Sequence, residues 1–223
     1  MNWSIAEGMF MDSELINIFN EQREPIGVAT REDVHKYGYW HEVFHCWLLS
    51  QTEGVHCIYF QLRSDNKKDY PNLLDITAAG HLMANETVED GIREIKEEIG
   101  IDVSHRELIS LGVFDYTVVR NEFIDKELAH VYVHHYSGAL DDFILQREEV
   151  AGMFIARFDD FYELWVGGKE KVDIHGFVLD DEGNRLHISK AVGKEHFVPH
   201  EDAFYQTIVK RIAEVLEEDR EEN

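Results

Sequence analysis

The chain has 223 residues, 44% of them hydrophobic, which is enough apolar material to bury a substantial core. Its 45 acidic residues outnumber 21 basic ones, and the formal charge of −24 disfavours nucleic acids and anionic membranes as partners. There is no cationic start followed by an apolar run, no stretch of roughly eighteen apolar residues, and no metal-site spacing around Cys46 and Cys57. We therefore expect a cytoplasmic protein with reduced thiols.

After a loose leader of residues 1–13, the first part of the chain predicts strands and one short helix. Thr30 is followed closely by acidic residues, so it can cap a helix that runs to Tyr37 and stops at Gly38. The runs on either side are rich in β-branched and aromatic residues and are separated by polar turns, which favours strands. The predicted strands cover residues 14–19, 25–29, 40–50 and 55–62.

The loop that follows, RSDNKKDYP, carries Arg63 and Lys67. Because the chain is so poor in cations, two of them close together indicate contact with an anionic substrate. Cations in loops are as often simply solvated, so both interpretations stay open.

The most informative stretch is GHLMANETVEDGIREIKEEIGI, residues 80–101. Its apolar residues recur at spacings of four, three and four, which predicts an amphipathic helix over 88–99. Helical geometry sets Glu94 beside Glu97 and Glu98, so these carboxylates repel one another unless a cation lies between them. The oxygen-preferring ions Mg²⁺ and Mn²⁺ suit such a group. A solvated acidic helix face is the plainer alternative.

This stretch resembles the Nudix box, a glycine and a glutamate followed by Arg-Glu-aliphatic-any-Glu-Glu-any-Gly-aliphatic. Six residues separate the first glutamate from the arginine, where the family has seven. The matching positions are Gly80, Glu86, Arg93, Glu94, Ile95, Glu97, Glu98, Gly100 and Ile101. The resemblance implies that Glu94, Glu97 and Glu98 bind metal with help from the loop backbone at Gly80. It also implies that Glu86 and Arg93 pair to brace the loop against the helix.

Further residues are similar to those of isopentenyl-diphosphate isomerase, a Nudix relative. The shared positions are His41, in the motif His-any-apolar-Phe, and His81 for its metal, and Arg63 and Lys67 for its diphosphate. Ala79 stands where the isomerase has its catalytic cysteine, and its Glu-any-Glu pair has no clear counterpart around residues 125–130. Without that acid and base the alkene chemistry lacks its proton donor and acceptor. The resemblance therefore implies a hydrolase of the isomerase-like branch.

Beyond the box, alternating apolar residues predict strands over 108–119 and 129–137. Glu148 and Glu149 follow them. In Nudix proteins acidic residues in this region often serve as the base or as an extra metal ligand, so both are candidates, and a solvated pair is the alternative. A short helix over 159–166 ends at two glycines.

Residues 169–223 form an extension to a Nudix domain of residues 1–168. Its sequence predicts a hairpin, with strands over 172–179 and 185–192, and then a helix over 203–218. The apolar stripe of that helix consists of Phe204, Ile208, Ile212 and Val215. Such a stripe must pack on the domain or on a second subunit, which leaves a homodimer open.

Together the patterns predict an α/β fold, the Nudix α/β/α sandwich with a mixed sheet, plus a C-terminal hairpin and helix. The resemblance implies a metal-dependent hydrolase, with Mg²⁺ or Mn²⁺ as cofactor, that cleaves the diphosphate bridge of a nucleoside diphosphate derivative or a similar organic diphosphate. A glutamate of the helix, or Glu148 or Glu149, would be the general base. The two alternatives are an isopentenyl-diphosphate isomerase-like enzyme and a catalytically silent nucleotide-binding regulator.

Overall fold

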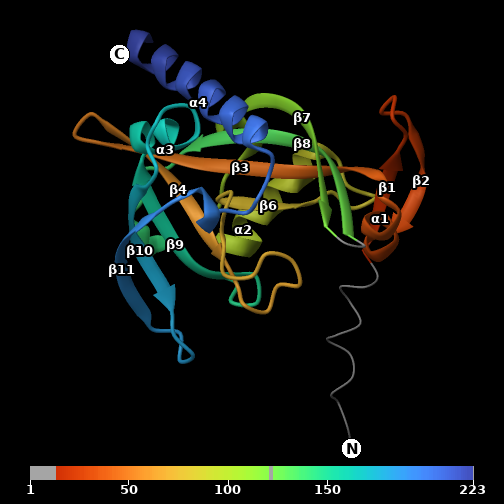
Figure 1. Cartoon of the computed structure of the whole chain (residues 1–223), viewed down its shortest axis with the longest axis horizontal. Coiled ribbons are helices and arrows are strands. Elements are labelled where there is room, and N and C mark those ends of the chain that lie inside the picture. Colours follow the sequence, from red (N-terminus) through yellow and green to blue (C-terminus); the bar gives the residue numbers. More distant parts are fainter. Residues whose placement is uncertain (1–13, 121–122, 223) are drawn as a thin grey trace, which may run out of the picture.

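A single large sheet organises the protein, as the computed structural model shows for residues 14–120 and 123–222 (Figure 1). Its longest path runs β11-β10-β9-β4-β3-β1-β2, and β5, β6, β7 and β8 pair off this path. The strands are β1 (Leu15–Phe19), β2 (Pro25–Thr30), β3 (Trp40–Thr52), β4 (Val55–Arg63), β5 (Leu74–Asp75), β6 (Ala78–His81), β7 (Leu108–Arg120), β8 (Phe123–His135), β9 (Val150–Arg157), β10 (Val172–Leu179) and β11 (Arg185–Val192).

The sheet is mixed, as predicted, because β3 pairs with β8 in parallel while every other named pair is antiparallel. Two elements differ from the sequence expectation. Strand β8 begins at Phe123, six residues before the predicted start, and β9 was not predicted as a strand at all. The segment that contains β9 is apolar without alternation, because β9 lies buried between β4 and β10.

Helices cover both faces of the sheet, which confirms the three-layer sandwich (Figure 1). Along β3, successive side chains point to opposite faces, so Phe44 packs with α2 (Arg93–Ile99) and Trp47 with the helices on the other side. Those helices are α3 (Phe158–Trp165) and α4 (Asp202–Glu222). The cavity described below is lined by Val43 of β3, on the α4 side of the sheet, and by residues of α2.

One predicted helix forms with the expected ends, and a second forms over part of its predicted length. Thr30 accepts a hydrogen bond from the Asp33 amide at the start of α1 (Arg31–Tyr37), and Gly38 closes that helix with a positive φ of 67°. The helix predicted over 88–99 is α-helical only from Arg93, since Val88–Ile92 form the 3₁₀ helix η3. A 3₁₀ helix rises about 2.0 Å per residue against about 1.5 Å for an α-helix, which gives this short connection extra reach.

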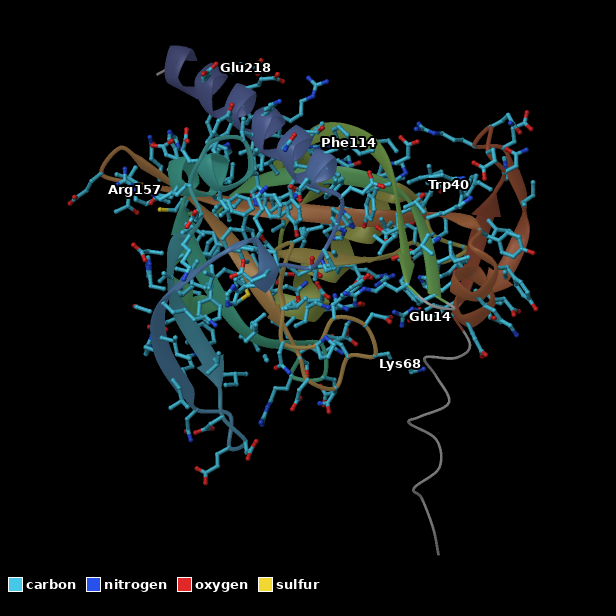
Figure 2. All side chains as sticks on the ribbon, viewed as in Figure 1. Glu14, Trp40, Lys68, Phe114, Arg157 and Glu218 are labelled. Atoms are coloured by element: carbon cyan, nitrogen blue, oxygen red, sulfur yellow. The ribbon has the colours of Figure 1, made fainter. Side chains whose placement is uncertain are left out.

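The C-terminal extension is integrated with the rest of the sheet. Strand β10 pairs with β9, and α4 packs on α3 and β7, where Tyr205 stacks on Trp165 with ring centroids 3.8 Å apart. Figure 2 shows Phe114 of β7 close to this helix. The division at residue 168 stays a prediction, although no break in the sheet coincides with it. Among the described residues, no helix has the length and apolar character needed to cross a membrane.

Candidate active site

One cavity of about 270 Å³ collects most of the residues that the sequence singled out. This volume lies just below the roughly 300–1,000 Å³ of typical small-molecule sites, so it can enclose only part of a nucleotide derivative. Its walls come from β3, β6, α2, the loop 64–73, the β7–β8 pair and the segment 198–200 of the extension. Widely separated parts of the chain thus meet at one polar cleft.

The helix α2 presents its glutamates to this cavity at three different depths. The Glu98 side chain is buried and accepts hydrogen bonds from the Ala79 amide at 2.9 Å and from Gln61 at 3.2 Å. Glu94 is largely buried, whereas the Glu97 side chain is 54% exposed. Gly80 lets the helix approach β6, because a Cβ there would lie 2.1 Å from a Glu94 carboxylate oxygen.

Burial raises the pKa values of both Glu94 and Glu98, and each carboxylate raises the pKa of its neighbours further. The charge of Arg93 opposes this shift at Glu94, and that of Lys67 opposes it at Glu98, without reversing either. Two buried carboxyl groups that resist ionisation side by side are an arrangement that a divalent cation would stabilise. These side chains therefore fit a metal ion.

Arg93 ties the loop after β6 to α2. Its Nε and Nη2 donate to the two carboxylate oxygens of Glu86 at 2.6 and 2.9 Å, and its Nη2 also reaches the His81 carbonyl at 3.2 Å. The Nη1 atom donates to Glu94 at 2.5 Å and to Glu97 at 3.0 Å. The contact expected from the resemblance is thus present despite the shorter spacing between Glu86 and Arg93.

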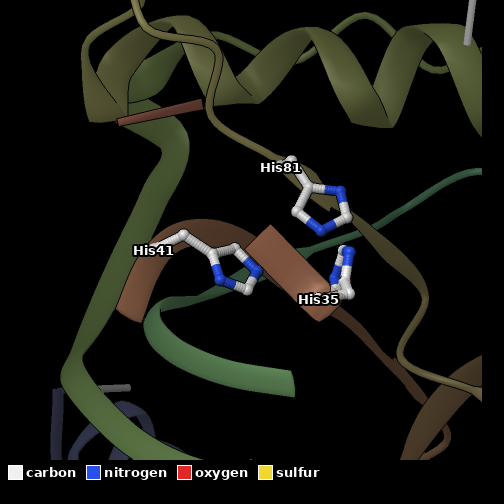
Figure 3. Close-up of side chains that lie close together, drawn as sticks. All are labelled: His35, His41 and His81. Atoms are coloured by element: carbon white, nitrogen blue, oxygen red, sulfur yellow. The ribbon is translucent and has the colours of Figure 1, made fainter. Parts of the chain in front are cut away.

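Three histidines from separate elements converge beside these glutamates (Figure 3). His35 comes from α1, His41 from β3 and His81 from β6, and their ring centroids lie 5.1–5.2 Å apart. Figure 3 shows the rings facing a common point. The sequence predicted His41 and His81 as a pair and missed His35, which sits on the buried side of a short helix.

The protonation of His41 and His81 suits metal ligation, whereas the contact with Asp125 outweighs burial and raises the pKa of His35. The Nδ1 atoms of His35 and His41 lie 2.8 and 3.1 Å from backbone carbonyl oxygens, so we assign the ring proton to Nδ1. The Nε2 atom of each ring then has a free lone pair that can bind a metal. Burial lowers the pKa of His41 to about 4 and holds that of His81 well below its usual range. The Nε2 atoms of His41 and His81 are buried without a hydrogen-bond partner.

A carboxylate completes this group, contrary to the sequence expectation. Asp125 Oδ1 is 3.5 Å from the Nε2 atoms of both His35 and His41, and it too is buried without a hydrogen bond. Asp125 and Glu127 are two residues apart on β8, so they point to the same face and both line the cavity. The Glu-any-Glu pair of the isomerase, for which the sequence showed no clear counterpart around 125–130, thus has an Asp-any-Glu pair in its place.

The predicted substrate cations are present in the cavity wall, each with an acidic partner. Arg63 donates to Asp75 at 2.8 Å and to the Asp69 carbonyl at 2.7 and 3.0 Å, while Lys67 pairs with Glu149. Glu149 thus lines the cavity. Glu148 is exposed and is not among the residues that line it, so the structure separates the two glutamates that the sequence offered together.

The inner end of the cavity contains residues that the sequence did not identify. The Tyr116 hydroxyl donates to Glu127, and His45 Nε2 lies 3.5 Å from the same carboxylate. His200, from the extension, packs against Tyr116 with ring centroids 5.0 Å apart, and its Nε2 lies 3.5 Å from Asp75. Only the alternation of β3 and β8 could have indicated His45 and Glu127, and no local pattern marks His200.

No protein-family model matches the chain. An uncharacterized Nudix hydrolase of Clostridium acetobutylicum is 35% identical over 202 residues, which cover 91% of this chain and 98% of that relative. The chain belongs to the Nudix hydrolases. As a member of the family it is an enzyme of the pyrophosphohydrolase class, and Nudix hydrolases generally use divalent metals.

Two further proteins are similar to this Nudix hydrolase, one in sequence and one in structure. An isopentenyl-diphosphate Delta-isomerase of Aliivibrio fischeri is 30% identical over 142 residues, which cover 62% of this chain and 77% of that enzyme. The crystal structure of DR0079 from Deinococcus radiodurans superimposes with a TM-score of 0.54 at 19% identity, over 70% of this chain and 91% of that one. The second similarity shows a shared fold.

Proposed function

We propose that this Nudix hydrolase cleaves the diphosphate bridge of a nucleoside diphosphate derivative with the help of Mg²⁺ or Mn²⁺. The observation that carries the proposal is the pair Glu94 and Glu98. Both side chains are buried at the edge of a polar cavity, and burial raises both pKa values. A divalent ion bound between these carboxylates would offset the cost of burying their charges. When bound, such ions would neutralise phosphate charge, orient the leaving group and activate the attacking water.

The glutamates of α2 would hold the ions, each in its own way. Glu98 is fixed by the Ala79 amide and Gln61, which leaves its other carboxylate oxygen for a cation. Arg93 keeps Glu94 and Glu97 on one side of the helix, while Gly80 leaves room for the Glu94 carboxylate beside β6. The exposed Glu97 would reach an ion at the mouth of the cavity.

His41 and His81, joined by His35 and Asp125, would hold a further ion. The fit rests on three buried polar atoms that have no hydrogen-bond partner among residues 14–120 and 123–222: Nε2 of His41, Nε2 of His81 and Oδ1 of Asp125. All belong to this one cluster. A set rich in imidazole nitrogen favours Zn²⁺ or a similar transition-metal ion over Mg²⁺, whereas the carboxylates of α2 favour Mg²⁺ or Mn²⁺. The two groups would therefore differ in metal preference.

Glu149 is the candidate general base among the residues of the cavity. It lines the cavity and pairs with Lys67, and from there its carboxylate would accept a proton from water. Lys67 and Arg63 would also offset the charge of the diphosphate, although both already have acidic partners. Glu148, exposed and outside the cavity wall, has no part in this proposal.

The isomerase alternative is favoured by one observation and opposed by another. Tyr116 and Glu127 form a buried pair that could move a proton, which the sequence did not reveal. Ala79 nevertheless offers only a methyl group where the isomerase relies on a thiol. We therefore expect no incorporation of solvent deuterium into isopentenyl diphosphate, and incorporation at an enzymatic rate would overturn this assignment.

The direct test is product analysis by liquid chromatography and mass spectrometry after incubation with nucleotide-sugars and dinucleotides in Mg²⁺ or Mn²⁺. We expect two phosphate-bearing products, and a loss of turnover of at least about a hundredfold in Glu98→Gln. Glu148→Gln is the matched control and should retain full activity. Absence of hydrolysis across the panel, or equal activity of Glu98→Gln and wild type, would contradict the proposal.

A further inference from the structure

Tyr70, in the loop that follows β4, has an unusual backbone conformation. Its φ is +52°, in the left-handed region that residues other than glycine rarely adopt, although the next residue is Pro71, which favours extended backbone before it. Arg63 holds the loop in this shape. Its guanidinium donates to the Asp69 carbonyl at 2.7 and 3.0 Å, and its amide donates to the Leu73 carbonyl at 3.0 Å. Backbone strain of this kind persists only where surrounding contacts impose it, and it is concentrated at functional sites.

The Tyr70 side chain lines the cavity and ends in a hydroxyl without a partner. The ring lies under the Arg120 guanidinium of β7, with the Arg120 Cζ atom 4.4 Å from the ring centroid. The hydroxyl oxygen is buried and has no hydrogen-bond partner in the part of the chain that the structure describes. Burial raises the pKa of the phenol, so the hydroxyl keeps its proton at neutral pH. A buried donor in that state requires an acceptor.

The cationic donors of the cavity wall differ from this hydroxyl. Four lysine and arginine side chains line the cavity, and each lies beside a carboxylate. A substrate oxygen must compete with those carboxylates, whereas the Tyr70 hydroxyl can donate to it without giving up a partner. The cationic pairs are Arg31 with Glu14, Arg63 with Asp75, Lys67 with Glu149, and Arg93 with Glu86, Glu94 and Glu97.

The charges around the hydroxyl indicate which acceptor suits it. Arg120 and Arg63 act on it with positive charge, and Asp125 and Asp69 act on it with negative charge. Asp125 belongs to the proposed histidine cluster, and a divalent ion bound there would add two positive charges. A phosphate group fits between that ion and Tyr70, because its oxygens supply lone pairs to both at once. An alkyl group supplies none, and a sugar hydroxyl brings no negative charge.

We infer that the Tyr70 hydroxyl donates to a nonbridging phosphate oxygen of the substrate and positions the diphosphate against the proposed ions. The inference rests on the proposed function, to which the ions and the diphosphate belong. It adds a neutral donor from outside the Nudix box to substrate binding. Arg120 acts through Tyr70 as a positioning residue, since its guanidinium covers the ring that carries the hydroxyl.

The test compares two probes that cannot be cleaved. One is a nucleoside diphosphate sugar with a methylene group between its phosphorus atoms, and the other is methylenediphosphonate, the same bridge without organic groups. Binding of each to the full chain in Mg²⁺ is measured by isothermal titration calorimetry. Tyr70→Phe removes the hydroxyl and keeps the ring under Arg120. We expect this variant to bind both probes about 10- to 150-fold more weakly, the range for a hydrogen bond to a charged group.

Two further measurements separate binding from folding. Because the Tyr70 hydroxyl has no partner within the described residues, Tyr70→Phe should melt at or above the wild-type temperature in EDTA, whereas loss of a structural hydrogen bond would lower it. Tyr37→Phe is the matched control. Tyr37 is 58% exposed and is not among the residues that line the cavity, so this variant should keep both affinities.

Arg120→Met is a second variant that leaves Tyr70 itself unchanged. It removes the cation over the ring and should weaken the binding of both probes. In the Tyr70→Phe background the same change should have a smaller effect, because its influence passes through the hydroxyl. An effect of equal size in both backgrounds would show that Arg120 does not act through Tyr70 and would overturn its positioning role.

Equal affinity of Tyr70→Phe and wild type for methylenediphosphonate would overturn the inference. A loss confined to the sugar-bearing probe would overturn it as well, because the hydroxyl would then contact the organic group. A lower melting temperature of Tyr70→Phe, or a wild type that binds neither probe, would have the same consequence. The proposed function has its own readout. If the expected losses occur while the cleavable sugar compound is not hydrolysed, hydrolysis fails and the phosphate contact stands; hydrolysis together with unchanged affinities in Tyr70→Phe would mean the reverse.

Discussion

At the scale of single residues, the buried carboxyl of Glu98 couples the proposed metal site to stability. Its folded-state pKa is raised by burial, so its contribution to the stability of the metal-free protein is full below the ordinary glutamate pKa of about 4.3. That contribution is lost as the pH rises through the folded-state pKa. The metal-free fold should therefore weaken from mildly acidic to mildly alkaline pH.

Glu98→Gln should remove this pH dependence. Because glutamine does not ionise in this pH range, its burial costs no charge. We therefore expect the free energy of unfolding of the metal-free variant at pH 8 to exceed that of wild type by at least about 1 kcal/mol, the value of one pKa unit. Urea unfolding in EDTA between pH 5 and pH 8 measures the difference. Saturating Mg²⁺ should reverse the order, since wild type binds the ion more tightly. A variant less stable than wild type in EDTA at pH 8 would show that Glu98 is structural.

Arg93 supports a second prediction at this scale. Arg93→Lys cannot reproduce the two-pronged contact with Glu86, so the free energy of unfolding should fall by about 1–3 kcal/mol. Arg211→Lys, which alters an exposed pair with Glu214, is the control and should cost under about 0.5 kcal/mol. Chemical denaturation of both variants in EDTA tests this, and equal stability of the two would contradict a bracing role.

At the scale of elements, helix α4 should contribute heavily to stability. Ile208 is fully buried, so Ile208→Ala should lower the free energy of unfolding by about 2–5 kcal/mol. Lys210→Ala, on the exposed side of the same helix, should change it by less than about 0.5 kcal/mol. Thermal melting followed by circular dichroism compares the two. Similar effects of both substitutions would mean that the helix does not pack as described.

Sequence patterns predicted the elements better than they predicted the site. The hairpins, α1, α3 and the stripe of α4 follow from alternation, caps and helical spacing, which are local properties. Glu94 and Glu98 were found because they share one helix. His35, Asp125 and His200 meet the other site residues only through the packing of α1, β8 and the extension, and no local pattern encodes such meetings. The sequence also gave no sign that Gly91 packs closely against Phe44, where a larger side chain would not fit.

At the scale of the whole molecule, residues 169–223 should be required for folding. Strand β10 covers the edge of β9, and removal of α4 would expose the apolar surface of α3 and β7. We expect the fragment 1–168 to be insoluble or to lack a cooperative melting transition, measured by gel filtration and calorimetry. A soluble, monomeric fragment that melts like the full chain would show that the extension is a detachable module.

The location of His200 also has a consequence for synthesis on the ribosome. The glutamates of α2 and the histidines of β3 and β6 all precede the segment that begins at Phe197 in the chain, so they emerge from the ribosome before it. A nascent chain halted before residue 197 would therefore carry metal ligands without the complete pocket. Because the extension is required for folding, ion binding should begin only once α4 has emerged, and a chain arrested at successive lengths would show where binding begins.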